Sequence, residues 1–106
     1  MKAAQHWGIQ RLTAILLIPL SYWFIAFLQL CLHANFFEIK AWLTSPVNQI
    51  ALGTWFVVVC YHAAIGLQVV LEDYVSNRDK QLTAIWGVNV FFAGLALSAL
   101  VFLFQN

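Results

Sequence analysis

Three long stretches without a charged side chain restrict the fold of this chain more than any other feature. They cover about residues 12–32, 50–71 and 83–104. A helix rises 1.5 Å per residue and needs about 20 residues to cross a hydrocarbon core about 30 Å thick, so each stretch is long enough. Only 8% of the residues are charged, against about 25% in soluble domains. We therefore predict an all-α membrane protein in which residues 1–106 form one domain with three transmembrane helices, over about 12–32, 46–75 and 83–104.

The basic residues predict the orientation of the chain, because Lys and Arg remain on the cytoplasmic or matrix side of a membrane. Lys2 and Arg11 precede the first stretch, Arg78 and Lys80 follow the second, and only Lys40 lies between these two stretches. The N-terminus is then inside and the C-terminus outside. We expect a multi-pass protein of an inner membrane, bacterial or mitochondrial, in contact with lipid and not with nucleic acid. The short segment before Arg11 favours a bacterial or organelle-encoded chain.

One histidine stands near the middle of the second stretch. An unsatisfied polar group at this depth costs several kcal/mol, so His62 is expected to be neutral and to have a partner. A neutral imidazole can bind a metal through its free lone pair, or it can form a hydrogen bond with a carbonyl of a neighbouring helix. Gly66, one turn away, and Ala63 leave room on this side for either a partner helix or a flat macrocycle.

Three further polar residues are expected at the inner boundary. Tyr74 follows His62 by twelve residues, or about 18 Å along a helix, and serves either as an interfacial anchor or as a ligand contact. Asp73 gains nothing from an anionic leaflet, so we expect it to face protein, where it pairs with an arginine or relays a proton. Arg11 lies at the same depth and either extends to lipid phosphate or binds a carboxylate.

Proline and polar residues predict where the helices begin, bend and end. Ser45 is expected to cap the second helix, with Pro46 at its first position. Pro19 should kink the first helix, and residues 76–80 are expected to form a short polar turn.

These features together resemble a known family. They are the second-stretch pattern His62-x-x-x-Gly66 followed by Val70 and by Asp73-Tyr74-Val75, and the pattern His6-Trp7-x-x-x-Arg11 before the first stretch. The chain is similar to the small haem b membrane-anchor subunit of succinate dehydrogenase (complex II, succinate:quinone oxidoreductase). The size, the three spans and the inside N-terminus agree, so the resemblance covers nearly the whole chain.

The resemblance implies roles for four residues. His62 would be one axial ligand of a haem b that is shared with a second anchor subunit, which supplies the other ligand. Tyr74 would form a hydrogen bond with the carbonyl of ubiquinone, the substrate, and Asp73 would support it. Arg11 would lie beside the haem propionates and the quinone pocket. No catalytic residue is implied in the chain.

The same resemblance implies that succinate is oxidised elsewhere, on a flavoprotein subunit and an iron–sulfur subunit. This chain has neither a dinucleotide fingerprint nor a cysteine cluster, since Cys31 and Cys60 lie in different stretches and are expected to be small buried residues. The implied function is to anchor the complex and to carry part of the electron transfer from succinate to ubiquinone, with no activity alone.

Two alternatives remain open. A small proton-coupled transporter should carry an acid within a span, whereas every acid here lies at a boundary or in a loop. In a structural or assembly subunit without a cofactor, His62 would only form a hydrogen bond between helices.

Overall fold

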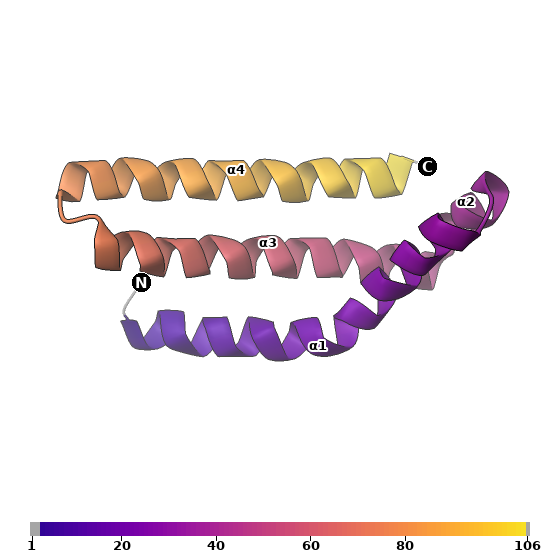
Figure 1. Ribbon diagram of the computed structural model, residues 1–106, viewed down its shortest axis with the longest axis horizontal. Helices are drawn as coiled ribbons and strands as arrows, with labels where there is room; N and C mark the ends of the chain where they lie inside the picture. Colours follow the sequence, from indigo (N-terminus) through magenta and orange to yellow (C-terminus); the bar gives the residue numbers. More distant parts are fainter. Residues whose placement is uncertain (1–2, 106) are drawn as a thin grey trace.

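Four helices account for almost all of the described chain. The computed structural model describes residues 3–105, and these form α1 (Ala3–His33), α2 (Phe36–Thr44), α3 (Pro46–Tyr74) and α4 (Arg78–Gln105), with no strand within that range (Figure 1). The helices α1, α3 and α4 are long and apolar enough to cross a membrane. The predicted all-α fold with three spans is therefore confirmed.

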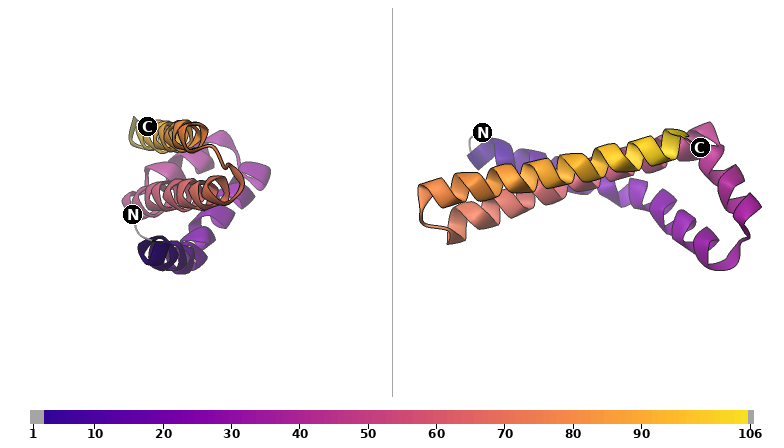
Figure 2. Two further views of the ribbon diagram at one scale, coloured as in Figure 1. Left: turned by 90° about the vertical axis from the view of Figure 1, so that its left-hand side faces the viewer. Right: turned by 90° about the horizontal axis from the view of Figure 1, so that it is seen from above.

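The three long helices form one layer with α3 in the middle. α1 lies along one side of α3 and α4 along the other, and the end-on view in Figure 2 shows them in a row. α3 runs antiparallel to both neighbours. The N-terminus lies at the same end as the α3–α4 connection, and α2 lies with the C-terminus at the other end (Figure 1). Which of these ends is inside stays a prediction.

The layer buries little of its apolar surface within the chain. In the most apolar windows, 28% of the residues of α3 are buried, against 6% in α4 and none in α1. A small core of Leu43, Leu52 and Leu103 joins the ends of α2, α3 and α4. Cys60 is buried as predicted, but Cys31 is exposed on this chain, so its predicted burial is wrong here. Helices that are apolar on all sides need lipid or other protein around them.

α1 is bent, so that only its first part follows α3. Its second part turns away from the layer toward α2 (Figure 1). Pro19 lies inside this helix, and because a proline removes one backbone donor and crowds the preceding turn, it explains the bend. The hydroxyl of Ser21 accepts a hydrogen bond of 3.1 Å from Trp55 Nε1 on α3. The predicted kink agrees with this shape.

The segment between the first two spans contains a helix that the sequence reasoning missed. Asn35 Oδ1 accepts a hydrogen bond of 2.9 Å from the backbone N–H of Glu38, and Asn35 Nδ2 donates to Glu38 Oε1 at 3.1 Å. The bond to the Glu38 N–H caps the start of α2, and the bond to the Glu38 carboxylate holds the Asn35 side chain in place. Ser45 occupies the predicted capping position before Pro46, but its side chain forms no capping hydrogen bond.

The second connection is shorter than predicted. α3 ends at Tyr74 and α4 begins at Arg78, so only residues 75–77 connect them and the expected polar turn over 76–80 is partly helical. Asn77 Oδ1 accepts from the backbone N–H of Lys80 at 3.1 Å. This capping bond extends α4 toward its N-terminus.

Candidate functional site

His62 is held by a threonine on the neighbouring helix. Its Nδ1 lies 2.7 Å from Thr13 Oγ1, and Thr13 is only 7% exposed at the contact between α1 and α3. The predicted partner of this imidazole is therefore identified for one of its two ring nitrogens. The partner is a hydroxyl and not the carbonyl that the sequence reasoning considered.

The other ring nitrogen is not engaged in the same way. Within residues 3–105, His62 Nε2 forms no hydrogen bond. The same part of the chain contains no group of three or more His, Cys, Asp or Glu residues that could hold a metal ion. A metal bound by His62 would use Nε2, while Thr13 restrains the ring through Nδ1.

Gly66 serves helix packing and not an open face. A Cβ atom at this position would lie 3.0 Å from Gln10 Nε2 of α1, so the glycine lets the Gln10 side chain approach α3 closely. The expectation that Gly66 provides space for a macrocycle is not supported by this contact. Ala63 borders an apolar groove of about 560 Å³, but His62 is not among the residues that line it.

A polar stripe on α1 faces this part of α3, and the sequence reasoning did not recognise it. His6, Gln10 and Thr13 are spaced four and three residues apart, so they share one face of the helix. His6 is 6% exposed, and within the described residues its Nε2 and Gln10 Oε1 are buried without a hydrogen-bond partner. The spacing of three polar residues on an apolar helix was the available signal. It places Thr13 beside His62, and His6 two turns closer to the N-terminus.

Arg11 points away from α3. It precedes Thr13 by two positions, which is roughly 200° around the helix axis, and its guanidinium lies 4.8 Å from the centre of the Trp7 ring. Arg11 is exposed, and within the described residues it forms no ion pair with Asp73. The structure therefore places Arg11 at the predicted end of the molecule but does not bring it to His62, Asp73 or Tyr74.

The predicted quinone residues lie at the end of α3 and are open to the surroundings of this chain. Tyr74 is the last residue of the helix and is 83% exposed. Asp73 is exposed as well, and within residues 3–105 neither side chain has an ion pair or hydrogen bond. Both are available to another subunit or to a ligand.

Gln81 fixes the backbone that carries these two residues. It is buried, and its Nε2 donates to the carbonyls of Glu72 and Val75 at 3.2 and 3.1 Å. Arg78 Nη1 in turn donates to Gln81 Oε1. The last carbonyls of a helix lack partners within the helix, so Gln81 satisfies them from α4 and holds the end of α3 near Tyr74.

Comparison with known proteins identifies the family. A family model described as "Succinate dehydrogenase/Fumarate reductase transmembrane subunit" matches residues 1–101. The chain belongs to this family. The succinate dehydrogenase hydrophobic membrane anchor subunit of Rickettsia bellii is 38% identical over 83% of this chain and 70% of its own length. The corresponding subunit of Rickettsia conorii is 35% identical over 97% and 82%. No solved structure gives a significant match.

The family confirms the resemblance that the motifs indicated. With its three apolar helices, this succinate dehydrogenase anchor subunit is a multi-pass inner-membrane protein. It belongs to an oxidoreductase complex and so has partner subunits in its assembly.

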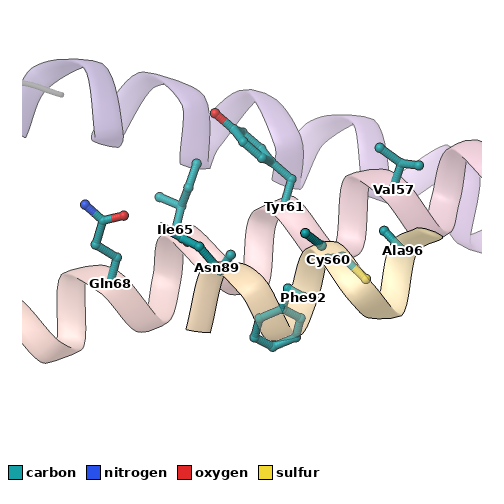
Figure 3. Close-up of a pocket in the computed structure, with 10 residues that line it drawn as sticks. Val57, Cys60, Tyr61, Ile65, Gln68, Asn89, Phe92 and Ala96 are labelled. Atoms are coloured by element: carbon teal, nitrogen blue, oxygen red, sulfur yellow. The ribbon is translucent and has the colours of Figure 1, made fainter. Parts of the chain in front are cut away.

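A second groove of the anchor subunit holds none of the predicted site residues. It lies between α3 and α4, has a volume of about 370 Å³ and is bordered by Tyr61, Gln68, Asn89 and Phe92 (Figure 3). Gln68 Nε2 donates to Glu72 Oε1 at 3.0 Å. Of the predicted site residues, His62 lies at the α1–α3 contact, Asp73 and Tyr74 lie at the end of α3, and none borders this groove.

Proposed function

We propose that this chain is one of two anchor subunits of succinate:ubiquinone oxidoreductase and that His62 is an axial ligand of a haem b. The supporting observation is the state of the imidazole, in which Nδ1 is bound to Thr13 while Nε2 forms no hydrogen bond within the described residues. Histidine ligands of metals commonly donate their second ring nitrogen to a neighbouring acceptor. The donor set of this chain thus fits one axial position.

The second axial ligand comes from a second anchor subunit. The other histidines of this chain are poorly placed, because His6 is buried two turns from Thr13 along α1 and His33 is the last residue of that helix, at the opposite end. A bound haem would supply reversible one-electron chemistry at this depth of the membrane. His62 itself contributes coordination and orientation.

The quinone headgroup binds at the end of α3. Tyr74 presents an exposed phenol there, which donates a hydrogen bond to a carbonyl oxygen of ubiquinone. Asp73 supports this position and keeps it accessible to protons. The assignment of these two roles rests on the resemblance in the motif, together with the exposure of both side chains.

Arg11 acts toward the partner subunit in this proposal. Since its guanidinium points away from α3 and rests against Trp7, it meets the haem propionates or the quinone pocket only on a face that another chain completes. Iron–sulfur and flavoprotein subunits carry out succinate oxidation and deliver electrons to this anchor.

A cofactor-free structural subunit is the second candidate, because the bond to Thr13 by itself already ties His62 to α1. This bond leaves Nε2 of His62 without a hydrogen bond within the described residues. We therefore favour the haem-ligating function. The transporter alternative gains no support, since the acids Glu38, Glu72, Asp73 and Asp79 are all exposed.

The test is the dithionite-reduced optical spectrum of the purified complex with His62→Ala and His62→Gln. We expect the b-type band to disappear in both variants while the flavoprotein stays attached to the membrane. His33→Ala is the matched control, because this exposed histidine lies at the other end of α1, and it should keep the band. An undiminished band in the His62 variants would contradict the proposal.

A further inference from the structure

We infer that Thr13 is a positioning residue, which holds His62 in the tautomer with the proton on Nδ1 and the lone pair on Nε2. This inference rests on the proposed haem ligation and names the residue that prepares the ligand for it. The supporting observations are three distances from the hydroxyl oxygen of Thr13 and the burial of Thr13.

The hydroxyl of Thr13 has several acceptors but only one hydrogen. Its Oγ1 lies 2.9 Å from the carbonyl oxygen of Ile9 and 3.1 Å from that of Gln10 on the same helix, and 2.7 Å from His62 Nδ1. If the hydrogen points to a helix carbonyl, a lone pair of Oγ1 faces Nδ1, which must then carry a proton. If it points to Nδ1, the proton of the neutral ring sits on Nε2, which cannot then bind iron.

The surroundings favour the first arrangement. Threonine in an apolar helix commonly donates to the carbonyl four residues earlier, and here that carbonyl, of Ile9, is within hydrogen-bond distance. At 7% exposure, Thr13 has little access to other acceptors. The Nδ1–H of His62 then donates to Thr13, and Nε2 is left with a lone pair before any metal arrives.

The contact between α1 and α3 continues beyond the Thr13–His62 pair. One turn away along both helices, Gln10 packs against Gly66, with its Nε2 where a Cβ atom would be crowded. The two contacts bring α1 and α3 together at His62. Donation from Nδ1–H also makes the ring a stronger donor to ferric iron, so the hydroxyl should lower the midpoint potential of the haem.

The first experiment compares Thr13→Val, Thr13→Ser and Thr54→Val in the purified complex. Thr13→Val keeps the shape of the side chain but removes the acceptor. We expect a more positive midpoint potential in an optical redox titration and a haem affinity lower by about 10- to 100-fold. Thr13→Ser should restore both values. Thr54→Val is the matched control, since Thr54 also donates to a carbonyl of its own helix, 2.8 Å away, but is exposed and has no imidazole partner.

The second experiment reads the tautomer without haem, from the nitrogen NMR spectrum of the full chain with labelled histidine in micelles. The wild-type chain should show His62 protonated on Nδ1, and Thr13→Val should lose this preference. A wild-type ring protonated on Nε2 would overturn the inference even if Thr13→Val did not assemble.

The outcomes separate this inference from the proposed function. If the His62 variants lose the b-type band while Thr13→Val leaves the potential, the affinity and the tautomer unchanged, haem ligation stands and the role of Thr13 is wrong. If the His62 variants keep the band, both fail together.

Discussion

The middle and the C-terminal end of α3 are built differently. At the middle, His62 is bonded to Thr13 and the contact continues to Gly66 and Gln10, so this region is completed by the chain's own α1. At the end, Tyr74 is exposed and only the backbone beneath it is held, through Gln81. One region is organised before any partner binds, and the other presents its side chains to whatever lies next to it.

This difference has a functional consequence under the proposed function. A metal ligand must have a fixed orientation, whereas a quinone must enter and leave, which an exposed phenol at a helix end permits. Changes at the α1–α3 contact should therefore affect the haem and spare quinone binding. Changes at the last turn of α3 should do the opposite.

The largest effect is expected for Gly66→Leu. The added side chain would collide with Gln10 and separate α1 from α3, and such overpacking costs about 1–3 kcal/mol. We expect most of the haem to be lost, because Thr13 no longer reaches His62, as measured by the b-type band per assembled complex.

Gly87→Leu is the control for this substitution, since within the described residues a Cβ atom at Gly87 would meet nothing within 4 Å apart from its own helix backbone and its chain neighbours. It should retain the haem band. Equal loss of haem in both variants would show that the Gly66 contact has no special part in holding His62.

An intermediate effect is expected for Tyr74→Phe. Removal of the phenol hydroxyl leaves the chain's fold unchanged, because the hydroxyl has no hydrogen bond within residues 3–105. We expect quinone reductase activity, measured as kcat/KM for ubiquinone, to fall about tenfold, which corresponds to about 1.4 kcal/mol for one hydrogen bond. The haem spectrum should not change. Undiminished kcat/KM would remove Tyr74 from the quinone site.

The smallest effect is expected for Gln81→Leu. The carbonyls of Glu72 and Val75 would lose their donor, so the last turn of α3 should open more often. We expect faster amide hydrogen exchange over residues 71–75 and an increase of a few-fold in KM for ubiquinone, with the haem band retained. Gln68→Leu removes an exposed side-chain bond nearby and should leave both measurements close to wild type. Loss of haem in Gln81→Leu would contradict the proposal that the end of α3 affects quinone binding without affecting the haem.

The sequence was sufficient for the spans and for the position of each site residue along its helix. Uninterrupted apolar length decides whether a helix crosses a membrane, and position along a helix decides depth, so His62 was placed in the middle of α3 and Tyr74 at its end. The need for a partner of His62 also followed from its place in the middle of an apolar span.

The sequence reasoning did not predict which side of α1 faces α3. Arg11 and Thr13 lie two residues apart and at nearly the same depth, yet Thr13 faces α3 and Arg11 faces away. The spacing of the polar residues on α1 indicated which face meets α3, but it was not used, so a similar position along the helix axis was mistaken for proximity. The capping pair of Asn35 and Glu38 was a readable signal for α2 that was not used.

The most direct test of haem ligation is a density map of the assembled, membrane-extracted complex at side-chain detail. We predict a planar macrocycle whose iron is bound by His62 Nε2, with Thr13 Oγ1 remaining on Nδ1. A map in which His62 Nε2 contacts only lipid or a polar group of a neighbouring helix, with no macrocycle beside it, would contradict the account.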